Sequence, residues 1–94
     1  MNADQINRSF ASAVPMRIRV EQNAERLRKR RKLTQTQLAE AMRDTAWKPV
    51  QRDISNFESG NYKTLNYDAL DAYVTIFNIS ADYLLGYSNW RETT

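Results

Sequence analysis

The segment from position 49 to position 61 reads Pro49-Val50-Gln51-Arg52-Asp53-Ile54-Ser55-Asn56-Phe57-Glu58-Ser59-Gly60-Asn61. Within it, Val50, Ile54 and Phe57 are spaced i, i+4 and i+7, which places them on one face of a helix. Gly60 suits the left-handed conformation that ends many helices. We therefore predict a short helix, about Val50 to Glu58, with an apolar inner face and a polar outer face.

The outer face of this predicted helix carries amide, guanidinium and carboxylate groups, on Gln51, Arg52, Asp53 and Asn56. These groups match the hydrogen-bond donors and acceptors on base edges in the major groove of DNA. An ordinary solvated face has a similar composition, and that is the alternative for all four side chains. We favour DNA and treat this segment as a candidate recognition helix.

The size and composition of the chain limit the classes of protein to consider. Its 94 residues suffice for one domain, and they include no cysteine and no histidine, which excludes disulfides and thiolate or imidazole metal sites. No apolar run approaches the ~18 residues that span a bilayer, and the N-terminus lacks the apolar core of a secretory signal. We expect a cytoplasmic protein with no metal or other cofactor and no contact with a membrane.

Basic residues are concentrated in one part of the chain. The net charge is only +3, but Arg17 to Lys32 holds eight Lys and Arg residues against two acids, Glu21 and Glu25. Such a cluster is typical of a surface that binds an anionic partner. It is equally typical of a helix end whose cations complement the negative pole of the helix dipole, so this run alone decides nothing.

Two helices are expected before the candidate recognition helix, at about residues 19–31 and 35–43. Apolar residues recur at helical spacing in both. Thr34 and Gln37 form a Thr-x-x-Gln capping box at the start of the second. The residues expected to face the core are Val20, Ala24, Leu27, Leu38, Ala39 and Met42.

Two more helices are expected after it, at about residues 67–77 and 81–85. Asn66 and Ser80 are suited to cap their N-termini, and Gly86 ends the last one. Trp47, in the connection before the recognition helix, is expected to cover the core, with a base or phosphate contact as the alternative. The other residues expected to face the core are Tyr67, Leu70, Val74, Phe77, Ile79, Leu84 and Leu85.

The remaining segments flank a predicted domain at residues 17–86. Residues 1–16 are polar, rich in small residues and aperiodic, so we expect a flexible N-terminal arm. There are two alternatives. The arm docks on the domain through Phe10, or it follows a DNA groove with the help of Arg8. Residues 87–94 are expected to form a C-terminal tail.

The order of these motifs resembles the Cro/CI (Xre-type) helix-turn-helix family of bacteria and their phages. The resemblance covers about Val20 to Gly86 and rests on Leu33-Thr34-Gln35, Leu38-Ala39, Ile54-Ser55, Phe57-Glu58-Ser59-Gly60 and Ile79-Ser80-Ala81-Asp82-Tyr83-Leu84-Leu85-Gly86. It implies an all-α, five-helix, lambda-repressor-like domain. Two departures stand out. The connection before the recognition helix exceeds the roughly three or four residues of a compact helix-turn-helix, and after Gly60 the family's basic residues become Asn61-Tyr62, which leaves only Lys63.

Position by position, the resemblance implies which residues contact DNA. Gln51, Arg52 and Asn56 are the implied base readers, whereas Asp53 either accepts from cytosine or favours the positive end of its helix. The implied phosphate contacts are Gln35, Lys48, Asn61 and Lys63. Arg28 and Glu58 match two family positions that form a partly buried ion pair.

The resemblance favours a sequence-specific regulator of transcription that binds double-stranded DNA, either a phage-type repressor or an antitoxin-like autoregulator. An adaptor that binds a protein partner through the same fold is the alternative; it would use the basic run at residues 26–32 and not the amides. An enzyme is not expected, because the sequence offers no nucleophile–base pair and no Gly-rich phosphate loop.

We also expect a homodimer on an inverted-repeat operator. Tyr83, Tyr87 and Trp90 are the expected interface aromatics, because aromatic side chains are enriched at interfaces. The alternatives are that they fold back onto their own core, or that the arm at residues 1–16 supplies the partner surface.

Overall fold

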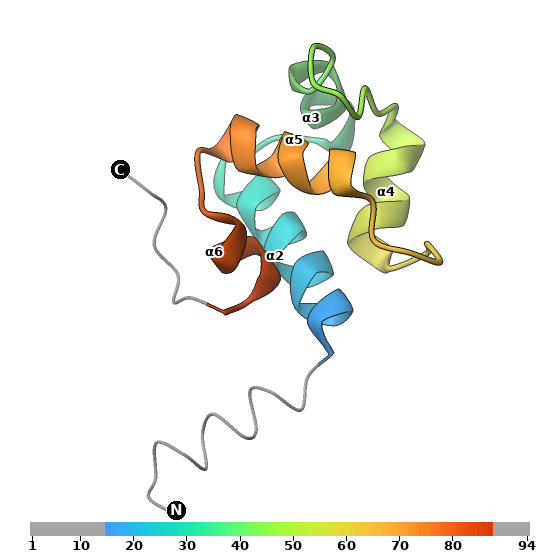
Figure 1. Cartoon of the computed structure of the whole chain (residues 1–94). Coiled ribbons are helices and arrows are strands. Elements are labelled where there is room, and N and C mark those ends of the chain that lie inside the picture. The colour runs from blue at the N-terminus through green and yellow to red at the C-terminus, as the bar shows by residue number, and fades with distance from the viewer. Residues whose placement is uncertain (1–14, 88–94) are drawn as a thin grey trace, which may run out of the picture.

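The computed structural model describes residues 15–87 of the chain. Within this range the chain forms five α-helices and no strand: α2 (Met16–Arg30), α3 (Gln35–Ala41), α4 (Gln51–Ser59), α5 (Tyr67–Phe77) and α6 (Ala81–Leu85) (Figure 1). The predicted all-α, five-helix class is confirmed. Most of the predicted arm and tail, with Trp90, falls outside the described residues. None of the described helices is long and apolar enough to cross a membrane.

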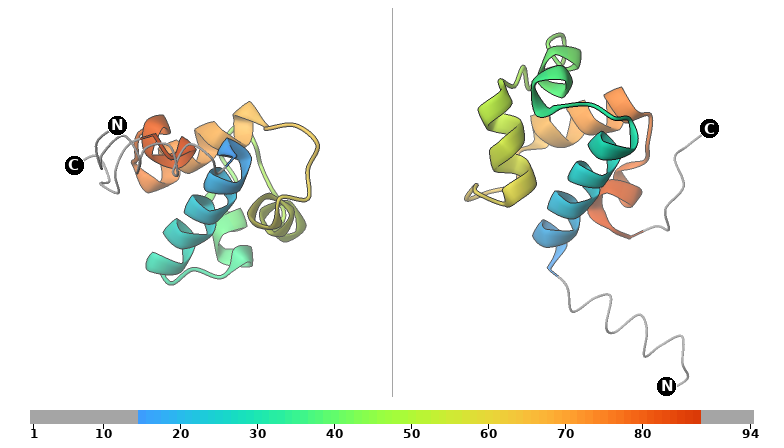
Figure 2. Two further views of the ribbon diagram at one scale, coloured as in Figure 1. Left: turned by 90° about the horizontal axis from the view of Figure 1, so that it is seen from below. Right: turned by 180° about the vertical axis from the view of Figure 1, so that it is seen from behind.

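The first helix, α2, lies at the centre, with α4 on one side and α6 on the other (Figures 1 and 2). It packs against both, while α3 packs against α4 and α5 against α6. The helix that holds the candidate base readers is therefore supported from two directions, by α2 and by α3.

Aromatic rings anchor the inner face of α4. The Phe57 ring centroid lies 5.1 Å from that of Tyr73 on α5, 5.4 Å from Tyr62 and 5.6 Å from Trp47. Trp47 thus covers the core, as predicted. Burial raises the pKa of the Tyr73 phenol far above its ordinary value, because the core disfavours the ionised form. The buried apolar residues are Val20, Ala24, Leu27, Leu38, Ala39, Met42, Ile54, Phe57, Ala69, Ala72, Tyr73, Phe77, Ile79, Tyr83 and Leu84.

The helix ends follow the predicted capping signals. Thr34 Oγ1 accepts from Gln37 N–H at 3.0 Å and Gln37 Oε1 accepts from Thr34 N–H at 2.8 Å, which confirms the capping box of α3. The side chains of Asn66 and Ser80 cap α5 and α6 by accepting from backbone N–H groups of the first turn, without the reciprocal bond of a capping box. Gly60 ends α4 with φ 74°, a left-handed conformation that glycine adopts without strain.

Two helix boundaries differ from prediction. The first helix begins at Met16 and not near Arg19, because Pro15 precedes it and its carbonyl accepts from the N–H groups of Ile18 and Arg19 at 3.0 and 3.2 Å. Proline is tolerated at a helix start, where no N–H partner is needed. At its other end, α3 stops at Ala41 and not near Arg43, since the chain turns there into the connection to α4.

Three side chains point elsewhere than predicted. Val50 and Tyr67 were expected in the core but are 63% and 84% exposed, because Val50 is the N-cap of α4 and Tyr67 the first residue of α5, both beyond the edge of the core. The inner face of α5 is formed instead by Ala69, Ala72, Tyr73 and Phe77. Tyr83, expected at an interface between subunits, is only 3% exposed and belongs to the core of its own domain.

The capping box of α3 predicts a measurable loss of stability. Thr34→Ala removes the acceptor for Gln37 N–H and should lower the free energy of unfolding by about 1 kcal/mol. Urea denaturation followed by circular dichroism measures this. Thr34→Ser, which keeps the hydroxyl, is the matched control, and equal stability of the Ala and Ser variants would contradict the assignment.

Candidate nucleic-acid interface

The first turns of α4 carry the candidate base readers on the side away from the core. Gln51 and Arg52 are exposed, and Asp53 and Asn56 are half-buried, while Ile54, Phe57 and Glu58 form the buried side. The structure therefore places all four predicted side chains outside the buried face of α4, on a surface that runs from Gln51, beside α3, round to Asp53, beside Trp47. We call this surface the α4 outer face and define it by Gln51, Arg52, Asp53 and Asn56.

A buried ion pair joins α2 to the end of α4. Arg28 Nε lies 2.7 Å from Glu58 Oε2 and Arg28 Nη2 lies 3.0 Å from Glu58 Oε1, which makes the pair bidentate. The two side chains are only 12% and 3% exposed. The hydrogen bonds to Glu58 raise the pKa of Arg28 above its ordinary value. Arg28 Nη1 also donates to the carbonyl of Leu33 at 2.8 Å, so the same side chain holds the turn before α3.

Hydrogen bonds through Gln35 connect the ion pair to the α4 outer face. Gln35 Nε2 donates to Glu58 Oε1 at 3.3 Å, and Gln51 Nε2 donates to Gln35 Oε1 at 2.6 Å. A side-chain amide has two N–H donors and one carbonyl acceptor. These bonds therefore orient Gln51 and still leave one N–H and the carbonyl of its amide for another partner. Sequence reasoning did not find the contact between Gln35 and Gln51, which are distant in the chain.

Asp53 contributes to helix α4 itself. Its Oδ2 accepts from Val50 N–H at 2.9 Å, and its carboxylate stands in the first turn, where negative charge is favoured by the helix dipole. Of its two predicted roles, this geometry supports the one at the helix end. Asn56 lies one turn further on, where its Oδ1 meets Asn61 Nδ2 at 3.5 Å, at the limit of a hydrogen bond.

The remaining phosphate candidates flank α4. Lys48 is exposed in the connection before the helix, and its φ of 48° is uncommon for a residue other than glycine. Asn61 and Lys63 are exposed in the connection after it. The structure thus places Gln35 and Lys48 near the start of α4, and Asn61 and Lys63 beyond its end.

The connection between α3 and α4 is long but anchored. Pro49 is buried, Trp47 packs on Phe57, and Thr45 Oγ1 donates to the carbonyl of Met42 at 2.6 Å. Because α3 and α4 still pack together, the extra length does not separate them. The departure from the family pattern leaves the start of α4 beside the start of α3.

The basic cluster at residues 17–32 has divided roles. The Arg17 guanidinium donates to the carbonyls of Gly60 and Tyr62 and lies 4.6 Å from the centroid of the Tyr62 ring. Arg19 Nε donates to the carbonyl of Leu85 at 3.1 Å, so it ties α2 to α6. Several members of the cluster thus hold the fold together. The exposed ones in its second half are Arg26, Lys29, Arg30, Arg31 and Lys32.

A family model described as a helix-turn-helix domain matches residues 23–86, more than half of the chain. The chain belongs to this helix-turn-helix domain family. The match includes Arg28 and all of α3 and α4, which supports a role in DNA binding. No curated protein and no solved structure matches the chain.

The buried ion pair predicts that Glu58→Gln is strongly destabilising. The change leaves the Arg28 charge buried without its partner, and removal of one member of a buried pair costs about 3–5 kcal/mol of unfolding free energy. Urea denaturation of the variant and the parent measures the difference.

The matched control for this prediction is Glu25→Gln. It breaks the pair between Glu25 and Lys29, whose side chains are 43% and 64% exposed, and it should cost no more than about 0.5 kcal/mol. If both variants lose the same small amount, Glu58 does not act as a buried partner.

Proposed function

We propose that this protein is a sequence-specific regulator of transcription of the Cro/CI (Xre-type) kind, which binds double-stranded DNA through α4. The observation that carries the proposal is the α4 outer face, which exposes amide and guanidinium groups on a helix anchored on its other side by Phe57 and Glu58. Membership of the helix-turn-helix domain family supports it. Repression is the proposed outcome, because a domain bound across a promoter excludes other proteins by occupancy alone.

Each proposed base reader has a chemically matched partner in the major groove. The N-terminal residues of a recognition helix are those that reach base edges. Arg52 presents a guanidinium for the two acceptors of guanine, and Asn56 an amide for the paired donor and acceptor of adenine. Gln51 donates one N–H to Gln35, and its other N–H and its carbonyl stay available. This pair of groups also fits adenine.

The proposed phosphate contacts fix the position of α4 along the groove. Gln35 stands in the first turn of α3, where backbone N–H groups add to the attraction for an anion. Lys48 precedes α4, while Asn61 and Lys63 follow it. Such contacts supply affinity and register without reading sequence.

The second candidate function is an adaptor that binds an acidic protein. The observation in its favour is the exposed basic group at the end of α2, formed by Arg26, Lys29, Arg30 and Lys32. An adaptor of this kind has no need of the amides on the α4 outer face. Substitutions on the two surfaces therefore separate the two functions.

Selection of bound sites from random duplex DNA tests the proposal. The selected duplex should bind with a salt dependence of about −0.9 in log K against log salt for each phosphate neutralised. Gln51→Ala, Arg52→Ala and Asn56→Ala should each lose discrimination at one base pair, worth about 1–3 kcal/mol for a bidentate contact.

Lys63→Ala is the matched control for the three reader variants. It should weaken binding to all sequences about equally, because a phosphate contact carries no sequence information. Uniform weakening by all four variants, with the preferred sequence unchanged, would refute the assignment of α4. Absence of binding to any duplex at low salt would refute the DNA-binding function itself.

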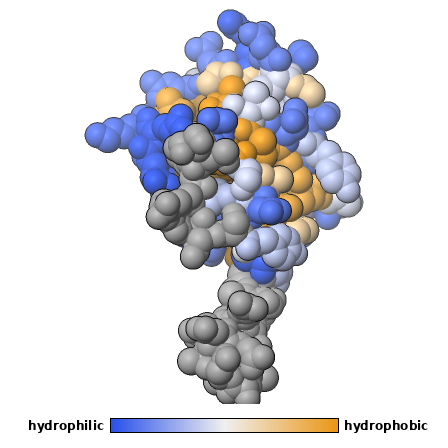
Figure 3. All heavy atoms as spheres, turned by 60° about the vertical axis from the view of Figure 1, so that its left-hand side comes forward, coloured by the Kyte–Doolittle hydropathy of each residue, from blue (hydrophilic) through white to orange (hydrophobic). Residues whose placement is uncertain are grey.

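We further propose that two copies bind an inverted-repeat operator. One small module buries only about 600–1,000 Å² on DNA, so pairing doubles the contacts that discriminate the operator. Since Tyr83 is buried, the described candidate surface is Tyr87, which is 67% exposed, with Met16 and Ile18, which are 38% and 40% exposed. Tyr87 and Met16 are in contact, with Tyr87 Oη 3.8 Å from Met16 Sδ. Figure 3, in which the left-hand side of Figure 1 comes forward, shows hydrophobic residues between hydrophilic ones on that face.

Analytical ultracentrifugation with and without the selected duplex tests the dimer. Two protomers should bind one duplex with half-sites about 10 bp apart or a multiple of that. Tyr87→Ser should weaken the second binding step, whereas Tyr67→Ser, a change at a tyrosine that is 84% exposed on α5, should not. One protomer on an asymmetric site would contradict the proposal.

A further inference from the structure

Val50 is an exposed apolar side chain placed directly before the base readers. It is 63% exposed and immediately precedes Gln51, the first residue of α4. A valine so exposed contributes little to the core. The proposed readers Gln51, Arg52 and Asn56 leave this side chain without a role.

The N-terminus of α4, like that of α2 at Pro15, lacks the side-chain cap that α3, α5 and α6 have. The N-cap side chains Thr34, Asn66 and Ser80 each accept a backbone hydrogen bond at the start of α3, α5 or α6. Val50 holds the N-cap position of α4 and makes no side-chain hydrogen bond there. Valine is among the least favourable residues at this position, whose φ of −100° and ψ of 173° are compatible with serine or threonine. Local rules of this kind are broken chiefly at functional sites.

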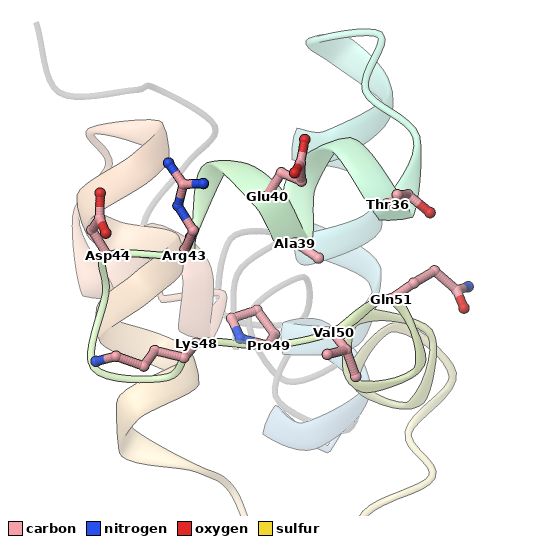
Figure 4. A pocket seen from close by; sticks show the side chains of 9 residues that line it. All are labelled: Thr36, Ala39, Glu40, Arg43, Asp44, Lys48, Pro49, Val50 and Gln51. Atoms are coloured by element: carbon pink, nitrogen blue, oxygen red, sulfur yellow. The ribbon is translucent and has the colours of Figure 1, made fainter.

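Val50 also lies in an apolar groove that continues to Gln51. The groove has a volume of about 570 Å³ between α3 and the start of α4. In Figure 4, Ala39, Pro49 and Val50 lie between the charged side chains of Arg43 and Lys48 at one end and the uncharged polar side chains of Thr36 and Gln51 at the other. This apolar strip is thus continuous with the α4 outer face.

The apolar feature that DNA presents in the major groove is the 5-methyl group of thymine. We propose that Val50 is a specificity-determining residue that receives this methyl group, on a thymine next to the base pair read by Gln51. The inference rests on the proposed DNA-binding function and names a fourth reader. Contact removes the valine and thymine methyl groups from water together, a gain that neither cytosine nor a purine offers.

The test compares thymine with uracil, which lacks only the 5-methyl group. Each thymine of the duplex selected by the wild-type protein is replaced singly by deoxyuridine, and binding is measured by fluorescence anisotropy. At one thymine position of each half-site, the single replacement should weaken wild-type binding about fourfold, the effect expected for one buried methyl group. The same replacement should leave binding by Val50→Ser unchanged.

Two further measurements separate this role from a structural one. Val50→Ser supplies the missing cap and should raise the melting temperature by about 4–8 °C, so weaker discrimination by this variant cannot come from unfolding. Val50→Ile keeps an apolar side chain at position 50 and should keep the sensitivity to uracil.

The outcomes distinguish this inference from the proposed function. Suppose that the protein binds a selected sequence, but no deoxyuridine replacement weakens binding by the wild-type protein more than binding by Val50→Ser. The inference is then overturned and the DNA-binding function stands. The inference is also overturned, and the DNA-binding function again stands, if the selected motif has no thymine beside the base pair that Gln51 reads. If no duplex is bound at low salt, both are overturned.

Discussion

The buried ion pair between Arg28 and Glu58 is the constraint on which the position of α4 depends. A buried pair is not in itself a strong source of stability, because desolvation of both charges offsets much of their attraction. Its geometry is nevertheless demanding, since two bonds at 2.7 and 3.0 Å fix the guanidinium and carboxylate relative to each other. Through Gln35 the same carboxylate reaches Gln51. The pair therefore sets where the α4 outer face lies and how its first reader is turned.

Apolar packing supplies the stability that the ion pair does not. The Phe57 ring contacts rings from the connection before α4, from the connection after it and from α5. Stacked or tilted aromatic contacts of this kind add to the gain from burial itself. Because Trp47 and Pro49 are held on this side, the long connection from α3 stays attached to the domain. Packing thus holds α4 against the core while polar contacts determine its orientation.

Local sequence signals predicted most of the fold, but they did not predict which residues at the helix starts lie outside the core. Helical spacing and the caps Thr34, Asn66 and Ser80 act within a few residues, so five helices were predictable. Spacing alone misplaced Val50 and Tyr67, which lie where the core stops. It also gave no sign that Gln35 meets Gln51, since that contact depends on how α3 packs on α4. The roles of the α4 outer face came from chemistry and resemblance, and they stay predictions.

A two-dimensional NMR titration of the 15N-labelled protein with its selected duplex is the most direct test of whether α4 binds DNA. The side-chain amide signals of Gln35, Gln51 and Asn56 are expected to shift strongly, together with the backbone signals of the first turns of α4. Signals from α6 should change little, except at its C-terminal end near Tyr87. Shifts centred instead on the basic end of α2, at residues 26–32, with the side-chain amides unchanged, would contradict DNA binding through α4.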